Sequence, residues 1–359
     1  MNKNNRLQYL ISLTISIAVA LLVGAGIMAV TGHDPLEGYS AMLQGAFGNQ
    51  RGLGNTLYKA GQLCITGLAT AVAAQAGIFN VGGEGQMFLG ALASAWVGAS
   101  LAGVSPWIAL PVCILASLVS GAVYAWIPAV LKVKLKVNEV ITTILMNSIA
   151  IYFCTYMANG PLKTSEKGIV TGTAKLSGDF MFTKLIPGSN LTDSILYIAV
   201  IALVIWYLMK KTTVGFEMKL TGQNSRFARY MGIPADKLAI VGMLISGAMC
   251  GLLGMFETFA VQSRFRPDFS NEFFFDGMLV AMIVQYQPLG IILMSFFFGV
   301  LKTGATSMQR IGISTELINI IQTMIIFFMA AESGFRQQLS LRKLRRNARK
   351  ENAALEVKA

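Results

Sequence analysis

Apolar segments recur along the whole of this 359-residue chain, and most are long enough to cross a lipid bilayer as a helix. The candidate spans are residues 9–30, 57–77, 87–104, 107–131, 140–157, 194–209, 238–256, 274–285, 289–301 and 317–331. A soluble domain carries about a quarter charged residues, whereas 13% of this chain is charged and 54% is hydrophobic. Polar side chains therefore cannot cover a globule of this size. We predict an all-α polytopic membrane protein with about ten transmembrane helices in residues 1–335.

The placement of Lys and Arg predicts the orientation in the membrane. Eight of the 29 lie between Arg336 and Lys358, beyond the last apolar segment. Ten crossings return this basic tail, residues 336–359, to the side of the N-terminus, and basic segments favour the cytoplasm. We therefore expect both termini and the basic segment 210–237 to be cytoplasmic.

One feature weakens the predicted orientation, and another leaves the number of crossings open. The predicted outer loop 159–192 carries four lysines, and the short C-terminal segments also fit nine or eleven crossings. The first apolar segment lacks a convincing cleavage site, so we expect it to remain as a span.

Two groups of four spans remain when the first and sixth are set aside. Residues 57–157 and 238–331 begin on opposite sides, which predicts two halves of inverted topology. Each half contains an interruption, one at 77–85 with four glycines and one at 285–290. Such interruptions indicate the central pathway of a transporter, because non-helical backbone in a bilayer must be covered by protein or water. The alternative is that both are tight turns at the membrane edge.

Polar side chains gather at the first interruption. Glu84 lies between two apolar segments, where a carboxylate is costly unless it gains a partner or water. Asn80 and Gln86 add donors and acceptors suited to hydroxyls, amides or a ring edge, while Gly82 and Gly83 let backbone amides converge. We predict that these residues line a translocation pathway. The other interpretation is that Glu84 caps the helix that follows it or makes a structural pair, and binds no ligand; the two interpretations are compatible.

Two further polar residues lie in other spans. Asn147 in the fifth segment suits an interhelical hydrogen bond or a contact with a ligand. Glu257 follows a segment with glycines at 247, 251 and 254, which favour close helix packing. We expect Glu257 near the outer interface, and we count it and Asn147 among the pathway candidates.

A short amphipathic helix is predicted in the basic segment, over residues 222–234, and Gly232 and Pro234 would close it. Its apolar side would comprise Phe227, Tyr230 and Met231, and its charged side Arg226 and Arg229. Such a helix lies in the membrane interface or docks into the groove of a soluble partner. The residues by themselves leave both interpretations open.

The sequence offers little for catalysis. It contains no GxxxxGK[ST] loop, and a single histidine, His33, excludes an HExxH site. We expect no catalytic residue, metal or cofactor, so that an ion gradient or a separate subunit would supply energy for transport. A secondary carrier or channel acting alone, and a membrane scaffold, are competing function classes.

Residues 77–91, Gly-Ile-Phe-Asn-Val-Gly-Gly-Glu-Gly-Gln-Met-Phe-Leu-Gly-Ala, resemble the signature of a family of permease subunits. These permeases belong to bacterial ABC importers of branched-chain amino acids, monosaccharides and nucleosides. The Phe-Asn-Val-Gly-Gly-Glu-Gly-Gln version is similar to the nucleoside branch, whose receptor is a lipoprotein of the basic-membrane-protein type. Residues 137–147, 222–233 and 288–304 also resemble the family, so that the similarity covers about residues 34–332.

The resemblance implies a fold similar to vitamin B12-type importers and a nucleoside importer of the bacterial cytoplasmic membrane that works by alternating access. The implied partners are a second permease subunit, identical or different, a cytoplasmic ABC ATPase and an extracellular binding lipoprotein; no nucleic acid polymer is expected. A monosaccharide or branched-chain amino acid permease is the alternative. The resemblance also assigns the 222–233 helix to coupling with the ATPase, through Gly222, Asn224, Arg226, Arg229, Tyr230 and Gly232.

Overall fold

The computed structural model describes residues 18–19, 21–165, 171–176, 181–270, 272–324 and 327. Two compact units make up the chain: Ala46–Thr303 is one, and Met1–Gly45 with Gly304–Ala359 is the other. The predicted basic tail, residues 336–359, and most of the first and last predicted spans lie outside the described residues.

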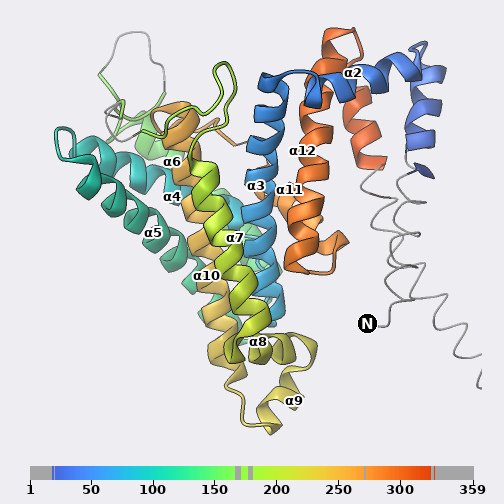
Figure 1. Ribbon diagram of the computed structural model, residues 1–359. Coiled ribbons are helices and arrows are strands. Elements are labelled where there is room, and N and C mark those ends of the chain that lie inside the picture. Colours follow the sequence, from blue (N-terminus) through green and yellow to red (C-terminus); the bar gives the residue numbers. More distant parts are fainter. Residues whose placement is uncertain are drawn as a thin grey trace, which may run out of the picture. The chain divides into compact units, whose positions relative to one another are not determined.

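The unit of residues 46–303 is built from helices joined by turns and irregular segments (Figure 1). They are α3 (Gln50–Gln75), α4 (Gly83–Ser100), α5 (Pro106–Leu135), α6 (Glu139–Asn159), α7 (Ser194–Lys211), α8 (Thr213–Gln223), α9 (Ser225–Tyr230), α10 (Ala235–Glu257), the π-helical turn η2 (Thr258–Gln262), α11 (Phe273–Ile283) and α12 (Pro288–Arg310), whose last turns belong to the other unit.

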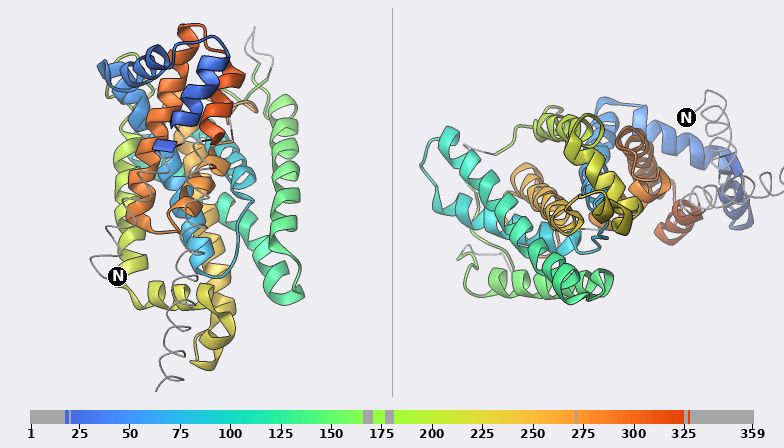
Figure 2. Two further views of the ribbon diagram at one scale, coloured as in Figure 1. Left: turned by 90° about the vertical axis from the view of Figure 1, so that its right-hand side faces the viewer. Right: turned by 90° about the horizontal axis from the view of Figure 1, so that it is seen from below.

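Helix α10 is the central helix of this unit, and it packs against α3, α4 and α5 (Figure 2). Glycines make this packing close: Gly247 faces the backbone of α5, Gly254 the backbone of α4, and Gly251 both. A side chain at any of these positions would meet backbone atoms of a neighbouring helix. The predicted role of the three glycines in helix packing is therefore confirmed.

Five helices in the described part of the chain are long and apolar enough to cross a membrane: α5, α6, α7, α10 with η2, and α12. They coincide with five of the predicted spans, although α12 continues to Arg310 rather than ending at residue 301. Helices α3 and α4 occupy the predicted spans 57–77 and 87–104 and begin earlier than expected, at Gln50 and Gly83. The total of ten spans and the inverted relation of the two halves stay predictions.

The second interruption is a tight turn between α11 and α12. Gln285 and Tyr286 have positive φ angles of 52° and 58°, and α12 begins at Pro288, where the missing N–H costs nothing. Gln285 and Gln287 are exposed. This geometry agrees with the turn interpretation of the second interruption.

The other unit contains a helix at Leu21–Val30, the start of α2 (Pro35–Phe47), the end of α12 and a helical stretch at residues 315–324. Asp34 accepts a hydrogen bond from the backbone N–H of Leu36 at 2.8 Å and so caps α2. The hydroxyl of Tyr39 donates to the carbonyl oxygen of Leu21 at 2.7 Å, which ties α2 to the first helix.

Candidate functional site

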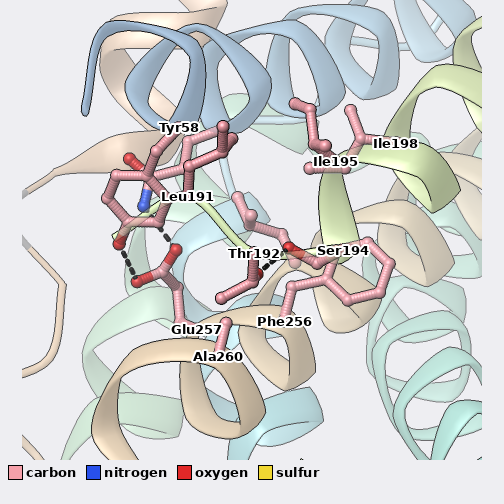
Figure 3. Close-up of a pocket in the computed structure, with 11 residues that line it drawn as sticks. Tyr58, Leu191, Thr192, Ser194, Ile195, Ile198, Phe256, Glu257 and Ala260 are labelled. Carbon is pink, nitrogen blue, oxygen red and sulfur yellow. Dashed lines mark hydrogen bonds between the residues drawn. The ribbon is translucent and has the colours of Figure 1, made fainter. Parts of the chain in front are cut away.

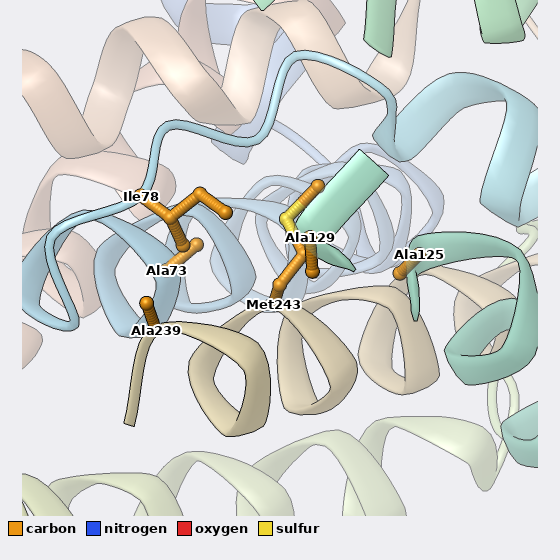
Figure 4. Close-up of a cluster of buried hydrophobic side chains, with 6 residues drawn as sticks. All are labelled: Ala73, Ile78, Ala125, Ala129, Ala239 and Met243. Carbon is orange, nitrogen blue, oxygen red and sulfur yellow. The ribbon is translucent and has the colours of Figure 1, made fainter. Parts of the chain in front are cut away.

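The first interruption is a buried segment between α3 and α4. Residues 76–82 form a turn followed by irregular backbone, and residues 80–88 are all buried. The Ile78 side chain anchors the segment in an apolar cluster that α3, α5 and α10 supply, with Ala73, Ala125, Ala129, Ala239 and Met243 (Figure 4). Irregular backbone in an apolar interior needs internal hydrogen-bond partners.

Asn80 supplies several of these hydrogen bonds. Its side chain is 0% exposed, and its Oδ1 accepts from the backbone N–H of Gly82 at 2.9 Å. Its Nδ2 donates to Gln86 Oε1 and to Ser246 Oγ, both at 2.9 Å. The predicted neighbours Asn80 and Gln86 therefore meet in one network, and Ser246 connects this network to the central helix α10.

Asn147 of α6 holds the same segment from the other side. Its Oδ1 accepts from the backbone N–H of Gly85 at 2.8 Å, and its Nδ2 donates to the carbonyl oxygen of Val81 at 2.8 Å. One amide side chain thus satisfies a donor and an acceptor of the backbone on either side of the start of α4. The structure brings Asn147 to the predicted site, as an interhelical hydrogen-bonding residue.

Glu84 is buried, with 5% of its surface exposed, and it points to the other half of the chain. Its carboxylate accepts hydrogen bonds from the hydroxyl of Ser270 and, at 3.2 Å, from the backbone N–H of Phe274. Phe274 is the second residue of α11, whose own N-cap residue, Glu272, makes no side-chain capping bond.

The carboxylate of Glu84 therefore caps α11 rather than the helix that contains it. Negative charge is favourable at a helix N-terminus, so Glu84 stabilises the start of α11 and ties α4 to it. Gly83 allows this approach, because a side chain at Gly83 would collide with the ring of Phe274. Both described hydrogen bonds of Glu84 go to residues 270–274, so Glu84 makes the structural pairing that was expected and no side-chain hydrogen bond caps α4.

The second buried carboxylate, Glu257, lies in a pocket between α3, α7 and α10 (Figure 3). Tyr58 Oη donates to Glu257 Oε2 at 2.6 Å, and Gln62 Nε2 donates to Glu257 Oε1. Thr192 and Ser194, whose hydroxyls are 2.7 Å apart, also line the pocket.

Glu257 is 2% exposed, because the helix continues through η2 to Gln262 and α3 covers the carboxylate with two donors. Its expected position near the outer membrane interface stays a prediction. Single π-helical turns occur frequently at functional sites. Glu257 forms a polar site of its own, and none of its described hydrogen bonds goes to the Asn80 network.

The basic segment folds as two helices, α8 and α9, rather than as one helix over 222–234. Asn224 separates them, because its Oδ1 accepts from the backbone N–H of Phe227 at 3.0 Å and begins α9. Gly222 belongs to α8, and its backbone lies against the C-terminal end of α3. Gly232 has a φ of +79°, which suits the turn into α10.

The predicted faces of this segment are exposed. Phe227, Tyr230 and Met231 have 51%, 91% and 64% of their surfaces accessible. Arg226 is exposed as well, and Arg229 forms an ion pair of 2.7 Å with Asp236 at the start of α10. We call Phe227, Tyr230 and Met231 the α9 patch.

A charged cluster inside the unit of residues 46–303 was not predicted. Lys302 Nζ lies 2.5 Å from Asp276 Oδ2, and Lys59 Nζ donates to the carbonyl oxygen of Lys302 at 2.8 Å. These contacts tie α3, α11 and α12 together. The sequence signal for this cluster was the presence of isolated charges within apolar segments, because such charges are retained in membranes only with partners.

The sequence also did not identify the hydrogen-bond partners of the predicted site residues, which are Ser246, Ser270, Tyr58 and Gln62.

Comparisons with known proteins identify the family of this chain. The family model of the branched-chain amino acid transport system permease component matches residues 52–330. The chain is 34% identical to the nucleoside ABC transporter permease protein NupB of Lactococcus lactis, over 92% of this chain and 93% of the relative. It is also 34% identical to the guanosine ABC transporter permease protein NupP of Bacillus subtilis, over 92% of this chain and 96% of the relative.

A third relative carries a different substrate in its name. The glucose ABC transporter permease protein TsgB13 of Haloferax volcanii is 32% identical, over 90% of this chain and 87% of the relative. No solved structure matches the chain. The extent of the family match, together with apolar helices able to span a membrane, shows that this chain belongs to the ABC importer permease family of the branched-chain amino acid transport type.

Proposed function

We propose that this chain is the membrane-spanning permease subunit of an ATP-driven importer that carries nucleosides across the bacterial cytoplasmic membrane by alternating access. The observation that carries the proposal is the buried interruption between α3 and α4, which concentrates polar groups in an apolar bundle. The names of two relatives, a nucleoside permease and a guanosine permease, support the substrate class.

In this proposal the pathway is lined by Asn80, Gly82, Gly83, Glu84, Gln86, Asn147 and Glu257. Asn80, Gln86 and Asn147 fix the backbone of the interruption, since their amides bond to it or to one another. Glu84 is the group that joins the two halves. Its carboxylate can release the hydroxyl of Ser270 and accept a hydrogen bond from a hydroxyl or ring N–H of a nucleoside instead, so that the number of hydrogen bonds stays the same.

The proposed partners are a second permease subunit, an extracellular binding lipoprotein and a cytoplasmic ABC ATPase. The α9 patch supports the last of these, because an exposed cluster of large apolar residues beside basic side chains suits the groove of a soluble protein. Gly222, Asn224, Arg226, Arg229, Tyr230 and Gly232 are the proposed coupling residues. Both termini are proposed to be cytoplasmic.

Uptake of radiolabelled guanosine by a strain lacking the gene tests the proposal. The wild-type gene restores uptake, and Glu84→Gln lowers it at least about tenfold, because losing a charge-assisted hydrogen bond costs about 1.5–3 kcal/mol. Glu37→Gln, an exposed acid on α2, serves as the control and keeps full uptake. Unchanged guanosine uptake in the deletion strain under purine limitation contradicts the proposed function.

The glucose permease among the relatives favours a second candidate, a monosaccharide importer. Uptake of guanosine in the presence of excess glucose or leucine separates the candidates within the family. Uptake of radiolabelled glucose that depends on this gene, with no gene-dependent uptake of guanosine, would establish the monosaccharide candidate. A carrier acting alone would instead transport in vesicles that contain this chain without an ATPase.

A further inference from the structure

The last residue of α3, Gln75, lies where the coupling segment meets both interruptions. The first interruption starts directly after it, at Ala76. Ala76 is buried in a small apolar cluster with Met218 of α8 and Leu238 of α10. The end of α3 is therefore packed against α8 and α10.

Helix α8 touches this end of α3 backbone to backbone. A Cβ atom on Gly222 would lie 2.6 Å from the carbonyl oxygen of Gln75 and 2.9 Å from that of Ala74. Gly77, with a φ of +80°, makes the reciprocal contact, because its Cβ would lie 3.3 Å from the carbonyl oxygen of Thr221. No flexible side chain separates α8 from the start of the first interruption at these two glycines. A displacement of α8 is therefore transmitted almost in full to the start of the interruption.

The second interruption is bound to the same place. Gln75 Nε2 donates to the carbonyl oxygen of Tyr286 at 2.9 Å. Tyr286 is one of the two left-handed residues of the turn between α11 and α12. A second link runs from the end of α7, where Lys210 Nζ donates to Gln287 Oε1 at 2.7 Å.

We propose that Gln75 is a positioning residue that ties α8 to both interruptions, so that a shift of α8 moves the two interruptions together. The inference rests on the proposed function, in which an ATPase acts on the 210–237 segment. Gln75 acts through its side-chain amide on Tyr286 and through its carbonyl oxygen on Gly222, and it touches neither substrate nor nucleotide.

The test measures coupling rather than activity alone. The assembled importer, with its second permease, ATPase and binding lipoprotein, is reconstituted in lipid vesicles. Guanosine uptake and ATP hydrolysis are measured on the same sample, and the number of ATP molecules hydrolysed per guanosine transported is the readout. A residue with a merely structural role changes the amount of assembled complex but leaves this ratio alone.

Gln75→Met keeps the length of the side chain and removes the donor to Tyr286. We expect the ratio of ATP hydrolysed to guanosine transported to rise about fivefold, because one hydrogen bond of ordinary strength changes the equilibrium between two conformations by about that factor.

Gly222→Ala separates α8 from Gln75 and raises the ratio as well, whereas Gln223→Ala, at an exposed neighbouring position, leaves it unchanged. Lys210→Met breaks the other link to the turn and is expected to be non-additive with Gln75→Met.

The outcomes separate the inference from the function beneath it. Normal ratios in both Gln75→Met and Gly222→Ala, with assembly intact, overturn the positioning role while the importer itself stands. A wild-type complex without guanosine-dependent ATP hydrolysis overturns the proposed function instead. If Gln75→Met fails to assemble, Gly222→Ala and Lys210→Met decide the question by the same ratio.

Discussion

At the scale of single residues, the buried polar side chains of this protein satisfy its irregular backbone. Asn147 is the clearest example, since its one amide serves both Val81 and Gly85. Removing it leaves a buried carbonyl and a buried N–H without these bonds, and an unpaired buried polar group costs about 1–3 kcal/mol.

We therefore expect Asn147→Ala to lower the free energy of unfolding by about 2 kcal/mol or more. Thermal unfolding of the purified protein in detergent measures the effect as a lower midpoint. Asn159→Ala, at an exposed position at the end of the same helix, controls for the change in composition. Equal midpoints for the two variants contradict the clamping role.

The sequence indicated which polar residues matter and missed what they bind. Asn80, Glu84 and Gln86 stood out because they are polar residues among glycines between two apolar segments. Ser270 and Phe274, which bind Glu84, lie more than 180 residues farther along the chain. No local spacing encodes such a contact, because it depends on how α4 and α11 pack.

At the scale of elements, the glycines of α10 set the spacing of the bundle. Gly251 touches the backbones of both α4 and α5, so that a larger residue has no space to occupy without moving a whole helix.

Gly251→Leu is accordingly expected to abolish the correctly folded protein, while Val241→Leu, on an exposed part of the same helix, is tolerated. The fraction that elutes as a single symmetrical species in detergent gives the measurement. A Gly251→Leu protein that elutes like the wild type would show that the close packing is dispensable.

Helix existence was predictable, and helix boundaries in polar segments were not. Apolar runs located α5, α6 and α7 closely, because length and hydrophobicity decide these elements. One short helix was predicted in the basic segment, over residues 222–234, and the segment contains two, α8 and α9. Asn224 ends α8 and begins α9 at the same residue, and a continuous amphipathic pattern conceals such a junction.

At the scale of the whole molecule, the pattern of exposure separates faces with different expected partners. Helices such as α7 expose large apolar residues in keeping with contact to lipid. The α9 patch instead lies in the polar, basic segment 210–237, and we propose that a soluble partner covers it.

We expect Phe227→Asp combined with Tyr230→Ala to abolish co-purification of the ATPase while leaving the protein inserted in the membrane. Tyr207→Ala, which removes an exposed aromatic residue from α7, is the matched control and retains the ATPase. Retention of the ATPase by the double variant would assign its docking to another surface.

The start of α11 has a consequence for how the protein is made. Eleven residues of helix span about 16 Å, roughly half the hydrocarbon thickness. This helix cannot enter a bilayer by itself, and its N-terminus is completed by a carboxylate that the ribosome delivers much earlier, in α4. We therefore expect α11 to insert late in synthesis, after α4 has taken its place in the membrane.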